Sequence, residues 1–384
     1  MRPRFSFQKD AIIFAICLLA EKGGCSTMPW NANASVIAPI VVGTYDSSDR
    51  EGIHLIALNG ETGEIKRIGG VAGVENPSFV AVHPSKKRVY AVSETDDGGI
   101  VSYRYSSEVQ TLSELNRQPS RGDAPCHLRV DASGSWLVAV NYMTGSVCLY
   151  PIMEDGSIGP ISDQAVHEGS SVRTDRQEAA HAHSIFPIPG TKEWIVCDLG
   201  TDGLYIYRIE EPEGKLKLLK RFDTAKGAGP RHTAFHPSLP ILYVVEELSC
   251  AVSAYEYRAA DVELLPLQTV PTLPADFEGE NTCADIHLTE SGEFLYASNR
   301  GHDSLAVYRV LEDGKLQPLG QVSAGGRTPR SFAVFGDRWL LSALQDSNAI
   351  VSFRIGEDGI PVPAGHSISV VKPVSLELVP SRSE

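Results

Sequence analysis

One phrase recurs six times along this 384-residue chain, and this repetition restricts its fold more than any other feature. Each copy has a polar or Pro-led opening, a short apolar strand, a turn of His-Pro, Asp or Gly type, and a second apolar strand that ends in a polar pair. The copies are PSFVAVHPSKKRVYAVSE (77–94), PCHLRVDASGSWLVAVNY (125–142), AHSIFPIPGTKEWIVCDLG (182–200), PRHTAFHPSLPILYVVEEL (230–248), ADIHLTESGEFLYASNRG (284–301) and PRSFAVFGDRWLLSALQ (329–345). Their starts lie 45–57 residues apart, which indicates a repeat architecture rather than unrelated domains.

The repeat predicts a seven-bladed β-propeller. Each copy continues into further strands such as GSVCLYPI and SLAVYRVL, separated by EDGS and EDGK turns, and four short strands per unit are typical of a propeller blade. Residues 372–379 match the first strand of the phrase and residues 40–46 match the second, so a seventh unit is split between the two ends of the chain. We expect an all-β fold of four-stranded blades over residues 38–380, closed by pairing of the N- and C-terminal strands, with a tail at 381–384.

The N-terminal segment is expected to lie outside the fold. Residues 1–20 combine a basic start with a ten-residue apolar run, which is too short to span a bilayer as a helix. The segment resembles a secretory signal, but the EKGGC that follows is a poor cleavage site, and translation from Met28 would remove it. We therefore expect a leader at 1–37 and a cytoplasmic protein, with export as the alternative.

Charge and cysteine content exclude several classes of partner. The formal net charge of −14 argues against a nucleic-acid partner, because phosphate backbones are bound by clustered Lys and Arg. The seven cysteines are an odd number without a CxxC pair, so neither a zinc site nor a disulfide framework is indicated. We expect a reducing compartment, no metal, no cofactor and no stable membrane span.

The repeat also ranks positions by their place in the ring. The ends of the second strands carry Tyr45, Glu94, Tyr142, Leu199, Glu247, Arg300 and Gln345. The starts of the first strands carry Ser78, Cys126, Ala182 or His183, Arg231, Ala284, Arg330 and Val374. These positions should converge at one mouth of the central channel, where buried charges need either each other or a ligand. Glu247 could pair with one arginine in a salt bridge, and a second arginine would then suit an anionic ligand.

Several polar residues have structural interpretations. His83 and His236 are expected to cap turns, and Asn141 and Asp198 are expected to have structural roles at the ends of their strands. His181 and His183, in the sequence HAH, should point the same way on a strand. That spacing can suit a metal, but no carboxylate has a matching position, so acid–base chemistry is preferred.

The phrases HAHSIFPIPG, GPRHTAFHP, IHLTESGEFLYASNRGHDS and PRSFAVFG resemble the lactonase family of seven-bladed propellers, over about residues 40–380. That family includes 6-phosphogluconolactonases and is related to the fungal carboxymuconate cycloisomerase. The resemblance implies His183, Glu247, Arg231 and Arg300 as the catalytic set. We also expect Arg231, Arg300, Arg330, Glu94 and His127 to bind substrate. The chain departs from the family pattern at Glu246, where Asn usually precedes the glutamate, and before Gln345, where Leu replaces Asn.

The expected function is hydrolysis of a sugar lactone, with 6-phosphogluconolactone as the foremost candidate. His183 or Glu247 would activate water, while Arg231 and Arg300 would bind the small anionic lactone and polarise its carbonyl. No G-x-S-x-G nucleophile elbow is present, so direct attack by water is preferred to an acyl-enzyme. Two alternatives stay open: a cycloisomerase that makes a lactone from an unsaturated diacid, and a non-catalytic scaffold that binds partners through loops such as QEAAHAH and ADFEGENT.

Overall fold

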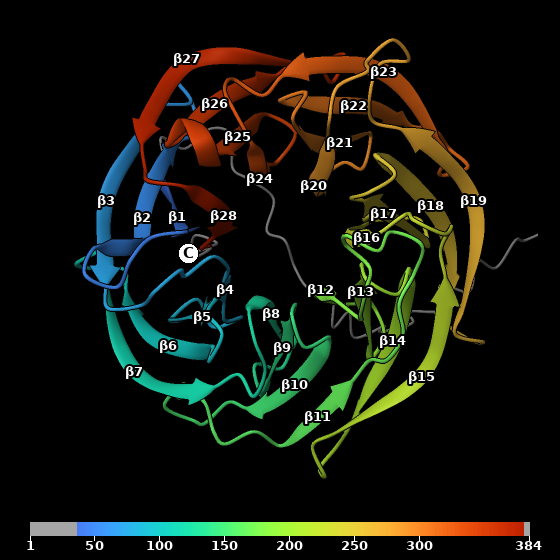
Figure 1. The fold of residues 1–384 in the computed structure, drawn as a ribbon. Helices are drawn as coiled ribbons and strands as arrows, with labels where there is room; N and C mark the ends of the chain where they lie inside the picture. The colour runs from blue at the N-terminus through green and yellow to red at the C-terminus, as the bar shows by residue number, and fades with distance from the viewer. Residues whose placement is uncertain (1–36, 380–384) are drawn as a thin grey trace, which may run out of the picture.

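Seven antiparallel sheets of four strands surround a central channel in the computed structural model, which describes residues 37–379 (Figure 1). The predicted all-β, seven-bladed fold is confirmed. The expected leader, except for its last residue, and the expected tail at 381–384 lie outside the described residues. None of the described residues forms a helix of the length and hydrophobicity that crossing a bilayer requires.

Each blade presents its strands in the same order from the channel outward. The innermost strands are β28 (Pro373–Leu378), β4 (Val80–Val82), β8 (Pro125–Val130), β12 (Ala182–Pro187), β16 (Pro230–Phe235), β20 (Thr282–Leu288) and β24 (Pro329–Phe335). The second strands are β1 (Ile37–Thr44), β5 (Arg88–Ser93), β9 (Trp136–Asn141), β13 (Glu193–Asp198), β17 (Ile241–Glu246), β21 (Phe294–Arg300) and β25 (Trp339–Leu344), the last followed by the 3₁₀ turn η1 (Gln345–Ser347).

The outer half of each blade is more polar. The third strands are β2 (Glu51–Asn59), β6 (Gly99–Ser106), β10 (Ser146–Pro151), β14 (Gly203–Glu210), β18 (Ala251–Arg258), β22 (Ser304–Val310) and β26 (Ala349–Ile355). The outermost strands are β3 (Ile65–Ala72), β7 (Thr111–Pro119), β11 (Asp163–Val166), β15 (Lys215–Asp223), β19 (Glu263–Pro271), β23 (Leu316–Ser323) and β27 (Pro361–Ser369). Second strands such as β13 and β17 are buried along their whole length because neighbouring blades cover both faces.

The ring closes where the sequence predicts. The strand β28 pairs antiparallel with β1 from Ile40↔Leu378 to Thr44↔Pro373, so the first blade combines both ends of the described chain. Val374 and Leu376 of β28 are buried, and Leu376 belongs to the apolar cluster between the first and last blades. Closure thus gives β1 a partner on both sides, so the first blade has four strands like the others.

Turn glycines connect several blades to their neighbours. Tyr296 of β21 donates its hydroxyl to the carbonyl of Gly359 in the next blade, at 2.8 Å. Gly359 has φ +82°, and a Cβ there would lie 2.2 Å from the ring of Phe294. The repeated Asp-Gly turns are therefore contact points between blades, where only glycine fits.

A β-bulge at the start of the innermost strands aims one side chain into the channel. In β16, Pro230 pairs with Glu246 and His232 with Val245, which leaves Arg231 as an extra residue. The same irregularity occurs in β8, β12, β24 and β28, with Cys126, His183, Arg330 and Val374 as the extra residues. Bulges redirect side chains in this way, and here they fall at the positions that the repeat ranks as channel-facing.

Loss of the closing strand should destabilise the whole ring. A chain truncated before Lys372 should aggregate, or melt at least about 10 °C below the full chain, because β1 loses its partner and the burial of Val374 and Leu376 is worth about 4 kcal/mol. Differential scanning calorimetry measures the effect. The control is Val371→Ser, an exposed position whose substitution should leave the melting temperature unchanged. A truncated chain with the original melting temperature would contradict closure by β28.

Candidate active site

One end of the channel holds a cavity of about 300 Å³ whose walls are mostly polar. Six of the seven blades contribute to it, together with the loop between β11 and β12. Its lining residues are Glu94, Cys126, Tyr142, Arg176, His183, Glu247, Thr282, Arg300 and Arg330. A narrow extension of about 20 Å³ continues along the channel and is lined by Arg231 as well. The cavity is large enough for one ligand of the size of a sugar.

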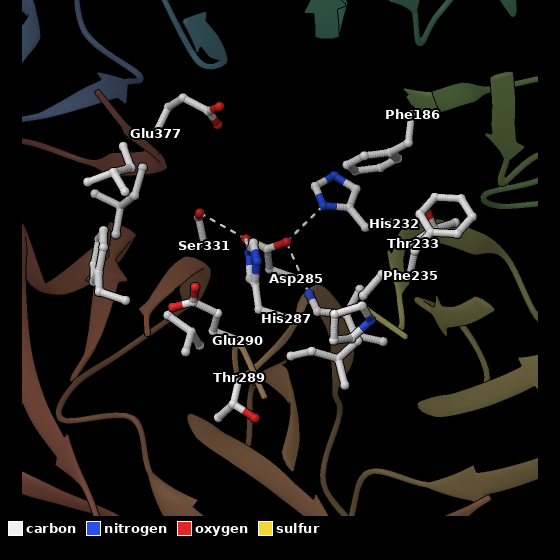
Figure 2. Close-up of a pocket in the computed structure, with 18 of the residues that line it drawn as sticks. Phe186, His232, Thr233, Phe235, Asp285, His287, Thr289, Glu290, Ser331 and Glu377 are labelled. Atoms are coloured by element: carbon white, nitrogen blue, oxygen red, sulfur yellow. Dashed lines mark hydrogen bonds and ion pairs between the residues drawn. The ribbon is translucent and has the colours of Figure 1, made fainter. Parts of the chain in front are cut away.

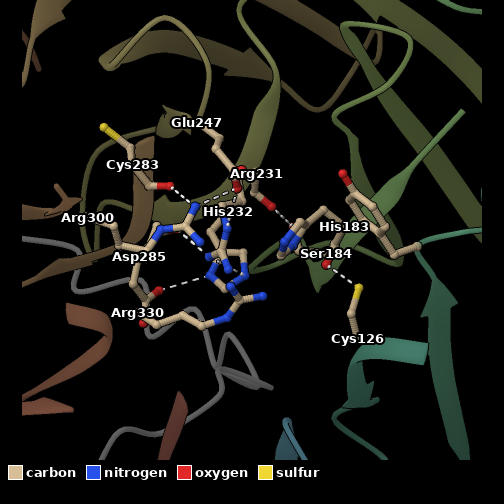
Figure 3. Close-up of polar contacts among 12 residues, drawn as sticks. Cys126, His183, Ser184, Arg231, His232, Glu247, Cys283, Asp285, Arg300 and Arg330 are labelled. Atoms are coloured by element: carbon tan, nitrogen blue, oxygen red, sulfur yellow. Dashed lines mark hydrogen bonds and ion pairs between the residues drawn. The ribbon is translucent and has the colours of Figure 1, made fainter. Parts of the chain in front are cut away.

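Glu247 is the centre of the charged network (Figure 3). Its Oε2 lies 2.9 Å from Nε of Arg231 and 3.0 Å from Nη2 of Arg300, and its Oε1 lies 2.6 Å from Nη2 of Arg176. Burial alone would raise the pKa of Glu247, but the charges of the three arginines outweigh it and lower that pKa to about 2. Glu247 is therefore a carboxylate at neutral pH and a weak base.

Arg330 belongs to a second network across the channel. Its Nη2 donates to the hydroxyl of Tyr45 at 3.0 Å, and its guanidinium lies 5.2 Å from the centre of that ring. The Tyr45 hydroxyl donates in turn to Glu94 at 3.0 Å, and Ser78 also donates to Glu94. Within residues 37–379, no carboxylate forms an ion pair with Arg330.

The cavity carries an excess of positive charge. Arg176, Arg231, Arg300 and Arg330 surround it, against the carboxylates of Glu247 and Glu94. Two positive charges thus remain uncompensated by the lining residues. Because guanidinium groups bind carboxylate and phosphate oxygens in a fork geometry, this arrangement is suited to a small anion.

His183 provides an uncharged group in the same cavity. Its ring is 5 % exposed and lies edge-on to Tyr142 and His232, with centroid distances of 5.6 and 5.4 Å. Burial, and then the charge of Arg231, hold the pKa of His183 well below its usual range. Its Nδ1 has no hydrogen-bond partner within the described residues. A neutral imidazole with a free nitrogen can accept a proton at pH 7.

The structure brings most of the residues expected from the sequence to one place. His183, Glu247, Arg300, Arg330 and Glu94 line the cavity. Arg231 lines its narrow extension and contacts Glu247.

His127 lies outside both spaces, although we expected it to bind substrate. Its ring is 0 % exposed and packs 4.0 Å from Phe79 and 4.8 Å from Phe186. The bulge at Cys126 explains this, because Cys126 takes the channel-facing position and His127 the packing position.

Arg176 is a residue that the sequence interpretation missed. It lies on the loop between β11 and β12, outside the repeated phrase, so no alignment of blades could find it. The neighbouring Gln177 is buried and donates to the carbonyl of Leu199 at 2.8 Å and to Asp202 at 2.7 Å. This anchoring holds Arg176 over the cavity mouth, with its side chain 34 % exposed. The only available signal was the unusual length of the loop.

The last residues of the second strands form hydrogen bonds that stabilise their own blades. Asn141 donates to Ser146 at 2.9 Å, and Asp198 accepts backbone N–H groups within its own blade. Glu246, where the family pattern has Asn, accepts from Ser253 at 2.6 Å and does not line the cavity. The departure from the family pattern at Glu246 therefore adds no carboxylate to the site.

The other histidines considered in the sequence analysis have local structural contacts. His83 and His236 accept backbone N–H groups in their turns, as expected. His181 stacks on Tyr142 at 4.5 Å, but it precedes β12, and only His183 lines the cavity. No three metal-ligating side chains gather in the part of the chain that the structure describes.

Neutralising Glu247 should destabilise the protein in a pH-dependent way. Glu247→Gln should lower the free energy of unfolding at pH 7 by about 3 kcal/mol, because the lowered pKa measures the interaction with the arginines. This contribution is complete above pH about 4.5 and is lost as the pH falls towards 2. Urea unfolding of both proteins at several pH values tests it. A difference in unfolding free energy that stays constant from pH 6 to pH 3 would contradict this account. The control is Glu256→Gln, because Glu256 forms an exposed ion pair with Arg258.

Comparisons with known proteins identify a matching family, related sequences and a similar fold. The family model described as "Lactonase, 7-bladed beta-propeller" matches residues 39–378. A Bacillus subtilis protein named 6-phosphogluconolactonase is 34 % identical over 343 residues, which are 88 % of this chain and 97 % of that protein. A Formosa agariphila protein of the same name is 32 % identical over 324 residues, 82 % of this chain and 91 % of its own. The structure of a periplasmic gluconolactonase from Pseudomonas aeruginosa superposes with a TM-score of 0.83 at 28 % identity, covering 89 % of this chain and 99 % of that one.

Proposed function

This chain belongs to the lactonase family of seven-bladed β-propellers, and we propose that it hydrolyses a phosphorylated sugar lactone, with 6-phosphogluconolactone as the foremost candidate. The observation that carries the proposal is the excess of two positive charges around a cavity of about 300 Å³ that also holds a neutral imidazole. A phosphate group carries between one and two negative charges at pH 7, which matches this excess. The cytoplasmic location stays a prediction.

Arg176 is our candidate for the phosphate ligand. It is the most exposed of the arginines that pair with Glu247, so it can turn towards a ligand at the cavity mouth with little loss of burial. Arg330, which has no carboxylate partner among the described residues, is the second candidate. Arg231 and Arg300 are held deeper by Glu247 and by backbone carbonyls, and we assign them to the lactone carbonyl.

The chemistry needs a base, and His183 fits this role better than Glu247. Arginine nitrogens lie 2.6–3.0 Å from both carboxylate oxygens of Glu247, whereas the imidazole of His183 has a nitrogen without a partner among the described residues. In our mechanism, the imidazole of His183 accepts one proton from a water molecule whose oxygen attacks the lactone carbonyl carbon. The oxyanion of the tetrahedral intermediate is stabilised by the guanidinium groups of Arg231 and Arg300.

The low pKa of His183 assists the second half of the reaction. Once protonated beside several arginines, the imidazolium is a stronger acid than usual, so it readily returns the proton to the ring oxygen of the lactone as the carbon–oxygen bond breaks. The products are the hydroxyl group and a carboxylic acid, which releases its own proton to solvent. Glu247 takes no part in proton transfer and instead keeps the buried arginines charged and in place.

A cycloisomerase acting on a carboxymuconate would use the same charge excess, because its substrate is also a polyanion. A panel that contains phosphorylated lactones, neutral lactones and carboxymuconate separates these activities. Turnover of carboxymuconate alone would favour the cycloisomerase, and turnover of none of the three would favour the non-catalytic scaffold.

Arg176→Gln should raise KM for the phosphorylated lactone by about tenfold to thirtyfold, since a charge-assisted hydrogen bond contributes on the order of 2 kcal/mol. KM for the unphosphorylated lactone should change less than twofold. Initial rates of acid release, corrected for spontaneous hydrolysis, measure both. Arg173→Gln, on the same loop but exposed and paired with Asp175, is the control and should change neither value. Equal effects of Arg176→Gln on both substrates would contradict a role in phosphate binding.

His183→Asn should lower kcat by about a hundredfold with little change in KM, the usual scale for loss of a positioned base. In the unsubstituted protein, kcat/KM should fall only well below pH 6.5, because His183 must be neutral and its pKa is lowered. An unphosphorylated lactone should be used for this profile, because a phosphate group itself titrates near pH 6. An acid limb at or above pH 6.5 would exclude His183 as the base.

A further inference from the structure

The channel continues past the proposed site to a second cavity at its other end. This cavity measures about 470 Å³, and Figure 2 shows His232 and Asp285 joined by a hydrogen bond among its lining residues. The narrow extension that contains Arg231 lies between the two cavities and shares His232 with the second one. The mechanism above uses none of the polar groups at this end.

Arg231 and His232 are consecutive residues that both reach the channel. Successive strand residues normally point to opposite faces, but the bulge at Arg231 removes this alternation. Nη1 of Arg231 lies 3.3 Å from Nε2 of His232, and Nδ1 of His232 lies 2.9 Å from Oδ1 of Asp285 (Figure 3). The three side chains thus form a continuous row between the two cavities.

The chemistry of the three groups fixes the proton on His232. A guanidinium can only donate hydrogen bonds, so Nε2 of His232 must accept from Arg231. A neutral imidazole has a single N–H, which must therefore be on Nδ1, where it donates to Asp285.

Asp285 is a buried carboxylate whose surroundings keep it ionised. It is 6 % exposed, and burial would raise its pKa, but neighbouring imidazoles and hydrogen bonds hold that pKa well below the usual range. Besides His232, it accepts from Ser331 Oγ at 2.9 Å and from the backbone N–H of Ile286 at 3.0 Å, and Nε2 of His287 lies 3.2 Å away. A buried carboxylate with this many donors is a stable acceptor for the Nδ1–H of His232.

We propose that Asp285 and His232 are positioning residues for Arg231: the carboxylate fixes the imidazole tautomer, and the imidazole fixes the guanidinium. Nη1 of Arg231 is held by His232 and by the carbonyl of Ala284, while Nε is buried 2.9 Å from Oε2 of Glu247 in an ion pair without hydrogen-bond geometry. Nη2 makes no hydrogen bond within residues 37–379, and unlike Nε it is not among the buried atoms, so it is the nitrogen left to stabilise the oxyanion. This inference rests on the proposed function only for the role of Nη2.

The tautomer can be tested without any substrate. Nitrogen-15 NMR at pH 7 of the full protein with labelled histidine distinguishes protonated from unprotonated ring nitrogens, and His232→Gln assigns the signals. We expect His232 to be neutral with its proton on Nδ1, and in Asp285→Asn the proton should move to Nε2 or exchange between the two nitrogens. A proton on Nε2 in the unsubstituted protein would overturn the proposal.

The kinetic test compares two substitutions of the same ring. A glutamine at position 232 can place an oxygen near the position of Nε2 and still accept from Arg231, whereas an asparagine can only reproduce Nδ1. His232→Gln should therefore retain kcat within about threefold, while His232→Asn and Asp285→Asn lower it by about tenfold to a hundredfold, since small misplacements of a catalytic group cost that much. KM should change less than threefold.

Thr233→Val is the matched control, because this residue lies on the same strand and lines the same second cavity, but its hydroxyl has no partner within residues 37–379. It should leave kcat unchanged. Equal losses in His232→Gln and His232→Asn, at equal melting temperatures, would overturn the positioning role. Absence of lactone turnover in every protein, with the tautomer as expected, would contradict the proposed function and leave the fixed geometry of Arg231 intact.

Discussion

One backbone hydrogen bond recurs in six of the seven blades and determines where the functional side chains lie. The N–H at the end of each second strand donates to the carbonyl of the residue two positions before the channel-facing residue, as from Glu247 to Gly229 at 2.7 Å. The other donors are Tyr45, Glu94, Tyr142, Leu199 and Gln345, at 2.9–3.1 Å. This bond fixes the end of the second strand against the bulge of the first. Because it involves only backbone atoms, it holds whatever side chains the two positions carry.

The two ends of the channel have opposite charge. Around the proposed site, arginines exceed carboxylates by two, whereas the second cavity is lined by Asp285, Glu290 and Glu377 against Arg129 alone. The chain as a whole carries a formal charge of −14, so the positive end is a local exception. An anionic substrate is attracted to that end and repelled elsewhere, which favours one direction of approach.

The sequence was sufficient for the architecture and for most of the cavity. Repetition at a fixed period identifies equivalent positions without any knowledge of contacts, so His183, Glu247, Arg300 and Arg330 could be assigned to one mouth. The prediction from the repeat failed where the local geometry differs from blade to blade.

Arg176 comes from an inserted loop, which has no counterpart in the other blades. His127 and His232 each follow a bulge residue, and the pattern could not tell which of them would pack against phenylalanine and which would contact an arginine. That difference depends on the neighbouring blades, which contribute Phe79 and Asp285.

The bulges make the channel a set of interchangeable positions. Five equivalent bulge residues face it, and the pairing that places them there is made by backbone atoms rather than by their side chains. Arginine and histidine occupy three of these five positions, while Cys126 and Val374 carry no charge. An evolving or engineered propeller can therefore acquire a new reactive group through one codon at any of these positions, without repacking a blade. The same fold can therefore acquire different chemistry while the residues that form its blades stay unchanged.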